Sequence, residues 1–157
     1  MAVQTSSALV ASPFILGENP LVKEAETILQ EGTRSVVLAQ YTLMARIAAS
    51  GKWTPFTNTS LTNTDGTQVA SGIYVGDDIA AATLVAGDTT GQILVGDAIV
   101  DGGQLVFGKG PTGALATITK ASVATIATGL PMQIEDALKT SAKIFIAQSL
   151  GIDAVEN

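Results

Sequence analysis

The sequence predicts a mainly β protein of the α+β class: a small β-sandwich or barrel-like domain with a C-terminal helix and a flexible N-terminal arm. Its 157 residues are enough for one domain with a sizeable core. Across the middle of the chain, short runs of β-branched and apolar residues alternate with glycine-containing breaks, a spacing that is typical of a sandwich or barrel. Near the C-terminus the apolar residues instead recur at helical spacing.

Residues 1–18 are predicted to form the arm. The segment mixes small polar and apolar residues without helical or strand periodicity, and Pro13 disfavours regular structure. So short a segment does not bury enough surface to become ordered alone. Residues 19–157 are predicted to form a single β-rich domain that holds the whole core. Deleting residues 2–16 should then leave the melting temperature nearly unchanged.

The strands are expected between about residue 27 and residue 108. The run "ILQEGTRSVVL" predicts strand, turn and strand, with Glu31–Gly32 at the turn, and "VVLAQYTLMARI" continues as β sequence. Asp65–Gly66 is a hairpin signal. The next strand is expected in "TQVASGIYVG", where Gly72 marks a bulge or a close backbone approach. Further short strands are expected in "AAATLVAGDTTGQILVGDAIVDGGQLVF".

The C-terminal helix is predicted over about residues 134–149. Glu135 and Asp136 fall in its first turn, where the helix dipole favours negative charge, and Gly151 provides a C-terminal cap. Replacing Leu138 or Phe145 by alanine should each cost about 2–5 kcal/mol, because both are expected to lie under the helix. The residues placed on one face by the spacing are Ile134, Leu138, Ala142, Phe145 and Ile146.

The composition excludes most catalytic chemistry. The chain contains no histidine and no cysteine, so the commonest general base, thiolate metal sites and disulfides are all missing. The net charge is −6 and the eight basic residues are scattered, which argues against a nucleic acid partner. No apolar run approaches the length of a membrane span. We expect no enzyme activity, no catalytic residues, no cofactor and no metal.

Three short motifs resemble chemical sites. Gly76-Asp77-Asp78 matches the magnesium-binding turn of viral polymerases, but the chain is too short for a polymerase and has no second carboxylate motif, so a solvated turn is expected. The stretch from Gly103 to Gly110 lacks the Ser or Thr of a phosphate-binding P-loop.

Asp97 and Asp101 form the third motif. They are predicted to lie on one strand, about 13 Å apart, which is too far for a shared metal. The enzyme alternative is a carboxylate-based hydrolase built from Asp77, Asp78 or Asp97.

Trp53 is the single tryptophan, in "SGKWTPF". Two interpretations remain open: an aromatic residue that covers one end of the barrel, or an anchor in a protein–protein interface, where tryptophan is enriched.

The order of these features resembles the head decoration proteins of tailed bacteriophages. In that family a strand pair precedes a G-K-(W/Y)-x-P turn, then a D-G-(T/S)-x-x-A-x-G-I segment, and a terminal helix ends in L-G-I. The chain departs from the pattern at Thr33-Arg34, which replaces a second strand glycine, and residues 110–130 look like an insertion. The positions that fit are Gly51, Lys52, Trp53, Pro55, Asp65, Gly66, Ala70, Gly72, Ile73, Leu150, Gly151 and Ile152.

The resemblance implies a viral structural protein that binds the outer surface of the expanded phage capsid and stabilises it. The alternative is another phage structural β-module, such as a tail-tube or head-fibre component. The implied partners are the major capsid protein and further copies of the chain, as a trimer or a dimer, without nucleic acid or membrane. The protein would be made in the host bacterial cytoplasm and act in the virion. The proposed capsid or subunit contacts are Leu9, Val10, Phe14, Ile15, Leu16 and Trp53.

Overall fold

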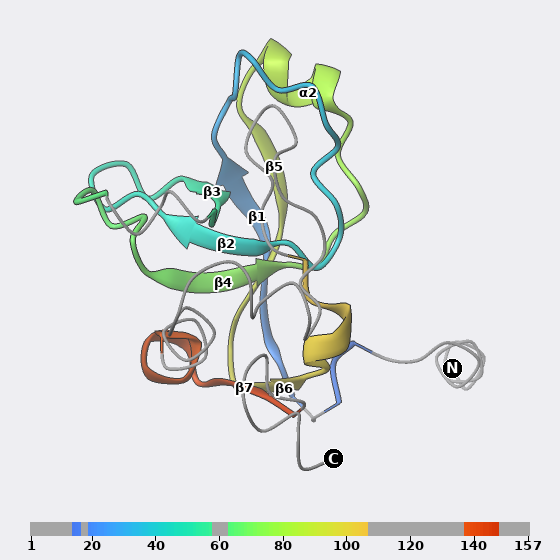
Figure 1. Cartoon of the computed structure of the whole chain (residues 1–157), viewed down its shortest axis with the longest axis vertical. Helices are drawn as coiled ribbons and strands as arrows, with labels where there is room; N and C mark the ends of the chain where they lie inside the picture. Colours follow the sequence, from blue (N-terminus) through green and yellow to red (C-terminus); the bar gives the residue numbers. More distant parts are fainter. Residues whose placement is uncertain (1–13, 17–18, 58–62, 107–136, 148–157) are drawn as a thin grey trace.

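The centre of the molecule is a closed five-stranded β-barrel (Figure 1). The computed structural model describes residues 14–16, 19–57, 63–106 and 137–147. Around the barrel the strand order is β1-β3-β2-β4-β5, and β5 closes onto β1. All neighbours are antiparallel except β1 and β3. The strands are β1 (Leu21–Ile28), β2 (Leu43–Arg46), β3 (Trp53–Pro55), β4 (Ala70–Tyr74) and β5 (Thr89–Gly96).

Each barrel strand contributes one large side chain to a first buried cluster inside the barrel. Successive strand residues face opposite sides, so Met44 points inward while its neighbour Leu43 points outward into a second cluster. Leu84 of α2 (Ala81–Ala86) also belongs to the first cluster. The members are Ile28, Leu38, Met44, Trp53, Tyr74, Leu84 and Ile93.

Several of the predicted turns and strands are confirmed. Strand β4 lies within the predicted segment, and Gly72 marks a close approach: a Cβ atom there would lie 2.9 Å from Ile93 Cγ2 and 3.0 Å from the Trp53 ring. Residues 31–34 form the predicted turn, closed by the Arg34 N–H donating to the Glu31 carbonyl. Gly51, with φ of +72°, lies in the turn that joins β2 to β3.

Three local predictions are wrong. Of the predicted run "VVLAQYTLMARI", the last part is the strand β2, but Leu38 and Thr42 form only isolated bridges, to Ile79 and Val106. Asp65–Gly66 does not close a hairpin, because β2 pairs with both β3 and β4, and these residues lie in the long β3–β4 connection. "AATLVA", predicted as strand, is the helix α2. Its alanines and leucine favour helix, and Leu84 covers the barrel interior.

A second layer packs on the outside of the barrel. It contains the parallel two-stranded sheet of β6 (Ala98–Val100) and β7 (Ile144–Ile146), the 3₁₀ turn η2 (Gly102–Gln104) and the helical turns at residues 137–142. In Figure 1 this layer lies at the opposite end of the molecule from α2. The second buried cluster joins this layer to the barrel; it comprises Phe14, Leu43, Ala45, Phe56, Ala70, Ile73, Leu94, Ala98, Val100, Leu105, Leu138, Ala142 and Ile144.

The C-terminal helix is shorter than predicted. Residues 137–142 are helical, Lys143 then takes a φ of 51°, and β7 begins at Ile144. Leu138 and Ala142 are buried as predicted, but Phe145 lies on a strand and is 48% exposed. The β-prone sequence Ile-Phe-Ile pairs residue by residue with β6, and this tertiary pairing overrides the helical periodicity. Residues 134–136 and 148–149 lie outside the described part of the chain.

The two positions should therefore respond differently to truncation. Leu138→Ala should lower the free energy of unfolding by about 2–5 kcal/mol, because it leaves a cavity between the helical turns and the barrel. Phe145→Ala should change it by less than about 0.5 kcal/mol, as expected for an exposed position. Urea denaturation of both variants measures the difference. A large loss at Phe145 would mean that its ring is covered by the rest of the chain.

The predicted arm includes residues that belong to the folded domain. Phe14 is 3% exposed, and its ring stacks on Tyr41 with centroids 4.0 Å apart and planes at 15°. The Asp101 N–H donates to the Phe14 carbonyl, and Ile15 forms an antiparallel bridge with Val100. Phe14 and Ile15, which the prediction places in the arm, therefore pack with the domain, and a deletion of residues 2–16 removes a core side chain. Residues 1–13 and 17–18 lie outside the described part of the chain.

Candidate interaction surface

The motifs that resemble chemical sites have structural roles. Within the described residues, no group of three or more acidic side chains could hold a metal ion. Every buried side-chain nitrogen or oxygen there has a hydrogen-bond partner. Among the described residues, no helix is long and apolar enough to cross a membrane.

The Gly76-Asp77-Asp78 motif is the turn after β4, as predicted. The Tyr74 hydroxyl donates to the Asp77 carbonyl, and the Asp78 carboxylate accepts from the Gln40 N–H at 2.7 Å. Burial, followed by the negative charges of Asp77 and Asp78, raises the pKa of Tyr74. The two carboxylates are exposed and therefore remain solvated.

Asp97 and Asp101 do not share a strand. Asp97, with φ of 51°, links β5 to β6, whereas Asp101 follows β6 and caps η2 by accepting from the Gly103 N–H at 2.9 Å. The predicted strand relation between them is wrong, because Asp97 precedes β6 and Asp101 follows it. Of the P-loop-like stretch, Gly103 lies in η2, and residues 107–110 fall outside the described part of the chain.

Trp53 is an interior residue in this structure. Its side chain lies inside the barrel at 3% exposure, and its indole Nε1–H donates to Glu26 at 2.9 Å. The Arg46 guanidinium lies 5.8 Å from the ring centroid. A side chain so enclosed offers almost no surface to a partner, which favours the first of the two interpretations of this residue.

The other proposed contact residues occupy different environments. Leu9 and Val10 lie outside the described residues. Phe14 is in the core, Ile15 is half-buried, and Leu16 is 49% exposed. Among the described members of the predicted contact set, Leu16 therefore presents the most surface.

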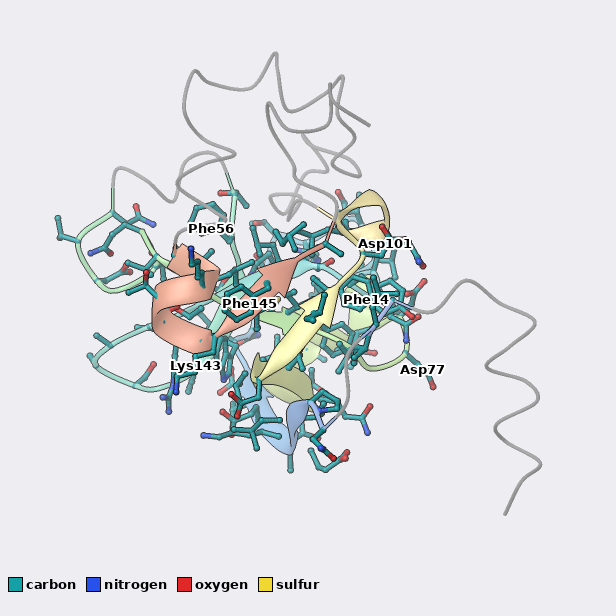
Figure 2. All side chains as sticks on the ribbon, turned by 90° about the horizontal axis from the view of Figure 1, so that it is seen from below. Phe14, Phe56, Asp77, Asp101, Lys143 and Phe145 are labelled. Atoms are coloured by element: carbon teal, nitrogen blue, oxygen red, sulfur yellow. The ribbon has the colours of Figure 1, made fainter. Side chains whose placement is uncertain are left out.

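Leu16 belongs to a row of exposed apolar side chains that crosses β7, β6 and the segment that bridges to β6. We call Leu16, Ile99 and Phe145 the apolar row. The Leu16 N–H donates to the Ile99 carbonyl at 2.7 Å, and Ile99 and Phe145 are paired in the β6–β7 register. Their exposures are 49%, 44% and 48%. In Figure 2, β6 lies between the strand that carries Phe145 and the segment that carries Phe14.

The row results from strand alternation on a sheet with one covered face. Val100 and Ile144 point into the second cluster, and the half-buried Ile15 packs against it. The residues next to them in each strand must then point outward. Two exposed charges of opposite sign, Asp97 and Lys143, directly precede β6 and β7. The half-buried Asp101 follows β6, so the charged residues that directly adjoin the two strands are two aspartates and one lysine.

Sequence reasoning missed Ile99 and Phe145. Helical spacing predicts Phe145 on the buried face of a helix, and the sequence does not identify which strand pairs with the segment around Ile99. The alternation of Ala98, Ile99 and Val100 indicates that the two faces of this strand differ, but it does not indicate which face is covered. The pairing of β6 with the distant β7 supplies that information.

Together these features define a small β-barrel protein whose described residues include no cluster that could hold a metal ion. The family model of the bacteriophage lambda head decoration protein D matches residues 3–130, and the chain belongs to this family. No curated protein and no solved structure matches the chain. The match ends before Leu138 and β7, so the predicted resemblance at residues 150–152 lies beyond it.

Family membership confirms the resemblance inferred from the sequence. It implies a structural protein that binds the phage capsid at the surface of the virion.

Proposed function

We propose that the protein attaches to the outer surface of the expanded phage capsid and stabilises the shell. The observation that carries this proposal is membership in the head decoration family. The physical basis is linkage: a protein that binds the intact expanded shell but not its dissociated subunits shifts the equilibrium toward the shell. Many copies on one particle add their effects, so that a modest affinity per copy suffices.

The partner is the major capsid protein, contacted through the N-terminal segment. Leu9 and Val10 are the proposed apolar contacts from the arm, and Leu16 is the proposed contact at its junction with the domain. Main-chain hydrogen bonds between the arm and a sheet edge of the capsid protein would add affinity, as in other cases of strand addition. Phe14 then serves as the attachment of the arm to the core, since its ring is enclosed beside Tyr41.

Copies of the chain are proposed to associate on the capsid as a trimer, with a dimer as the alternative. Mass photometry of the free protein and reconstruction of decorated particles count the copies in each cluster. A tail-tube or head-fibre component would instead assemble by itself into tubes or fibres, which negative-stain microscopy would reveal.

A binding experiment tests the function. The full chain is mixed with expanded and with unexpanded heads of its phage, the particles are sedimented, and bound protein is quantified. We expect saturable binding to expanded heads and a higher temperature of head disruption in their presence. The triple variant Asp77→Asn, Asp78→Asn, Asp97→Asn should bind and stabilise equally well, since no carboxylate chemistry is involved. Absence of binding by the wild-type chain would refute the proposal.

A further inference from the structure

We infer that the apolar row of Leu16, Ile99 and Phe145 is a docking surface for an apolar, extended segment of the major capsid protein. This inference rests on the proposed function and adds the part of the domain, outside the arm, that makes the contact. One of its three residues, Phe145, lies outside the residues matched by the family model.

The alignment of the row distinguishes it from other exposed apolar side chains. Four other apolar side chains are also partly exposed, but each lies on a different element: Leu21 at the start of β1, Val37 in a loop, Val69 beside β4 and Val85 on α2. The row instead joins the two strands of one small sheet with the segment of residues 14–16, which bridges to β6. Directly opposed side chains on one sheet face touch one another and form a continuous surface.

The size of the row favours the capsid over a second free copy as its occupant. Three side chains that are each about half exposed present an area on the order of a few hundred Å². Each partner in a stable two-protein complex buries roughly 800 Å². The row alone is therefore too small to hold two free copies together. It suits a contact repeated on every copy around a shell, where avidity and the arm add to it.

The chemistry of the row specifies the kind of segment it accepts. The surface is aliphatic and aromatic, and the charges beside it, on Asp97 and Lys143, have opposite signs. Among the described residues, no strand pairs with the far edge of β7. An extended segment laid along that edge would place alternate side chains over Phe145 and could hydrogen-bond to the edge. The favoured segment is uncharged and carries apolar residues at alternate positions.

Substitution of the row tests the inference. In the variant Leu16→Thr, Ile99→Thr, Phe145→Thr, the β-branched replacements preserve strand propensity while they remove apolar surface. We expect roughly ten- to a hundred-fold weaker binding to expanded heads. The matched control is Val85→Thr on α2, at the other end of the molecule, which should bind like the wild-type chain. Circular dichroism melting verifies that each variant is folded.

A second measurement does not depend on the stability of the triple variant. The chain has no cysteine, so Ile99→Cys and Val85→Cys each introduce a single thiol for maleimide labelling. Labelling at residue 99 should slow at least about ten-fold on expanded heads, because docking removes the thiol from solvent, while labelling at residue 85 should not.

The outcomes separate the two proposals. If the triple variant binds as tightly as the wild-type chain, or residue 99 stays equally reactive on the particle, the row is not the docking surface, although capsid binding itself still holds. If the wild-type chain fails to bind, both proposals fail. If the triple substitution changes only the mass of the free oligomer, the occupant is a second copy and the inference is overturned.

Discussion

Replacing Arg34 by alanine should lower the free energy of unfolding by about 3–5 kcal/mol, the cost of breaking a buried ion pair. The Arg34 side chain is 1% exposed, and its Nη1 lies 2.6 Å from Glu31 Oε2. Its Nε and Nη2 also donate to the carbonyls of Val36 and Val37. Removal of the guanidinium leaves an enclosed carboxylate and two carbonyls without these partners. Urea denaturation at neutral pH measures the loss.

Two controls isolate the cause. In the double variant Glu31→Gln, Arg34→Met, no uncompensated charge remains, so part of the lost stability should return. Lys52→Ala breaks the exposed Lys52–Asp88 pair, whose side chains are 36% and 35% exposed, and should cost less than about 1 kcal/mol. A loss at Arg34→Ala as small as that at Lys52→Ala would show that water reaches the Arg34 site.

Phe14→Ala should lower the free energy of unfolding by about 3–5 kcal/mol, as for other large aromatic residues in a core. The ring is stacked on Tyr41 and packs with the second buried cluster, so its removal leaves a cavity between the second layer and the barrel. Thermal and urea denaturation of the full-length variant measure the effect. The conservative variant Phe14→Leu refills most of the volume and should lose less.

Two truncations test where the arm ends and the folded domain begins. Deletion of residues 2–16 should be less stable than deletion of residues 2–13 by about the same 3–5 kcal/mol, because only the longer deletion removes Phe14. Equal stability of the two truncated proteins would mean that residues 14–16 do not contribute to the core, as expected for an arm that extends to residue 18. Both truncations should bind expanded heads more weakly than the full chain. Only the shorter deletion tests the arm contacts of Leu9 and Val10 without disturbing the core.

The sequence predicted what depends on local pattern and composition. The absence of histidine and cysteine excluded the common catalytic and metal chemistry. The alternation around Gly72 located β4, and helical spacing identified Leu138 and Ala142 as buried. The succession of turn and strand motifs was sufficient to identify the family. Each of these signals lies within a few neighbouring residues, where backbone geometry and side-chain periodicity act directly.

Where the sequence failed, the deciding contact was distant along the chain. Ile144–Ile146 fits a helical pattern, but pairing with β6 makes it a strand and turns Phe145 outward. Similarly, nothing near Phe14 shows that its ring stacks on Tyr41.

The apolar row likewise exists only in the tertiary structure, because it joins Leu16, Ile99 and Phe145 through the strand pairing. A strand pattern says that its two faces differ, but which face is buried depends on the element that packs against it. The sequence by itself therefore determined the class and the family of the protein. The tertiary structure alone decided which side chains are enclosed and which remain free to meet a partner.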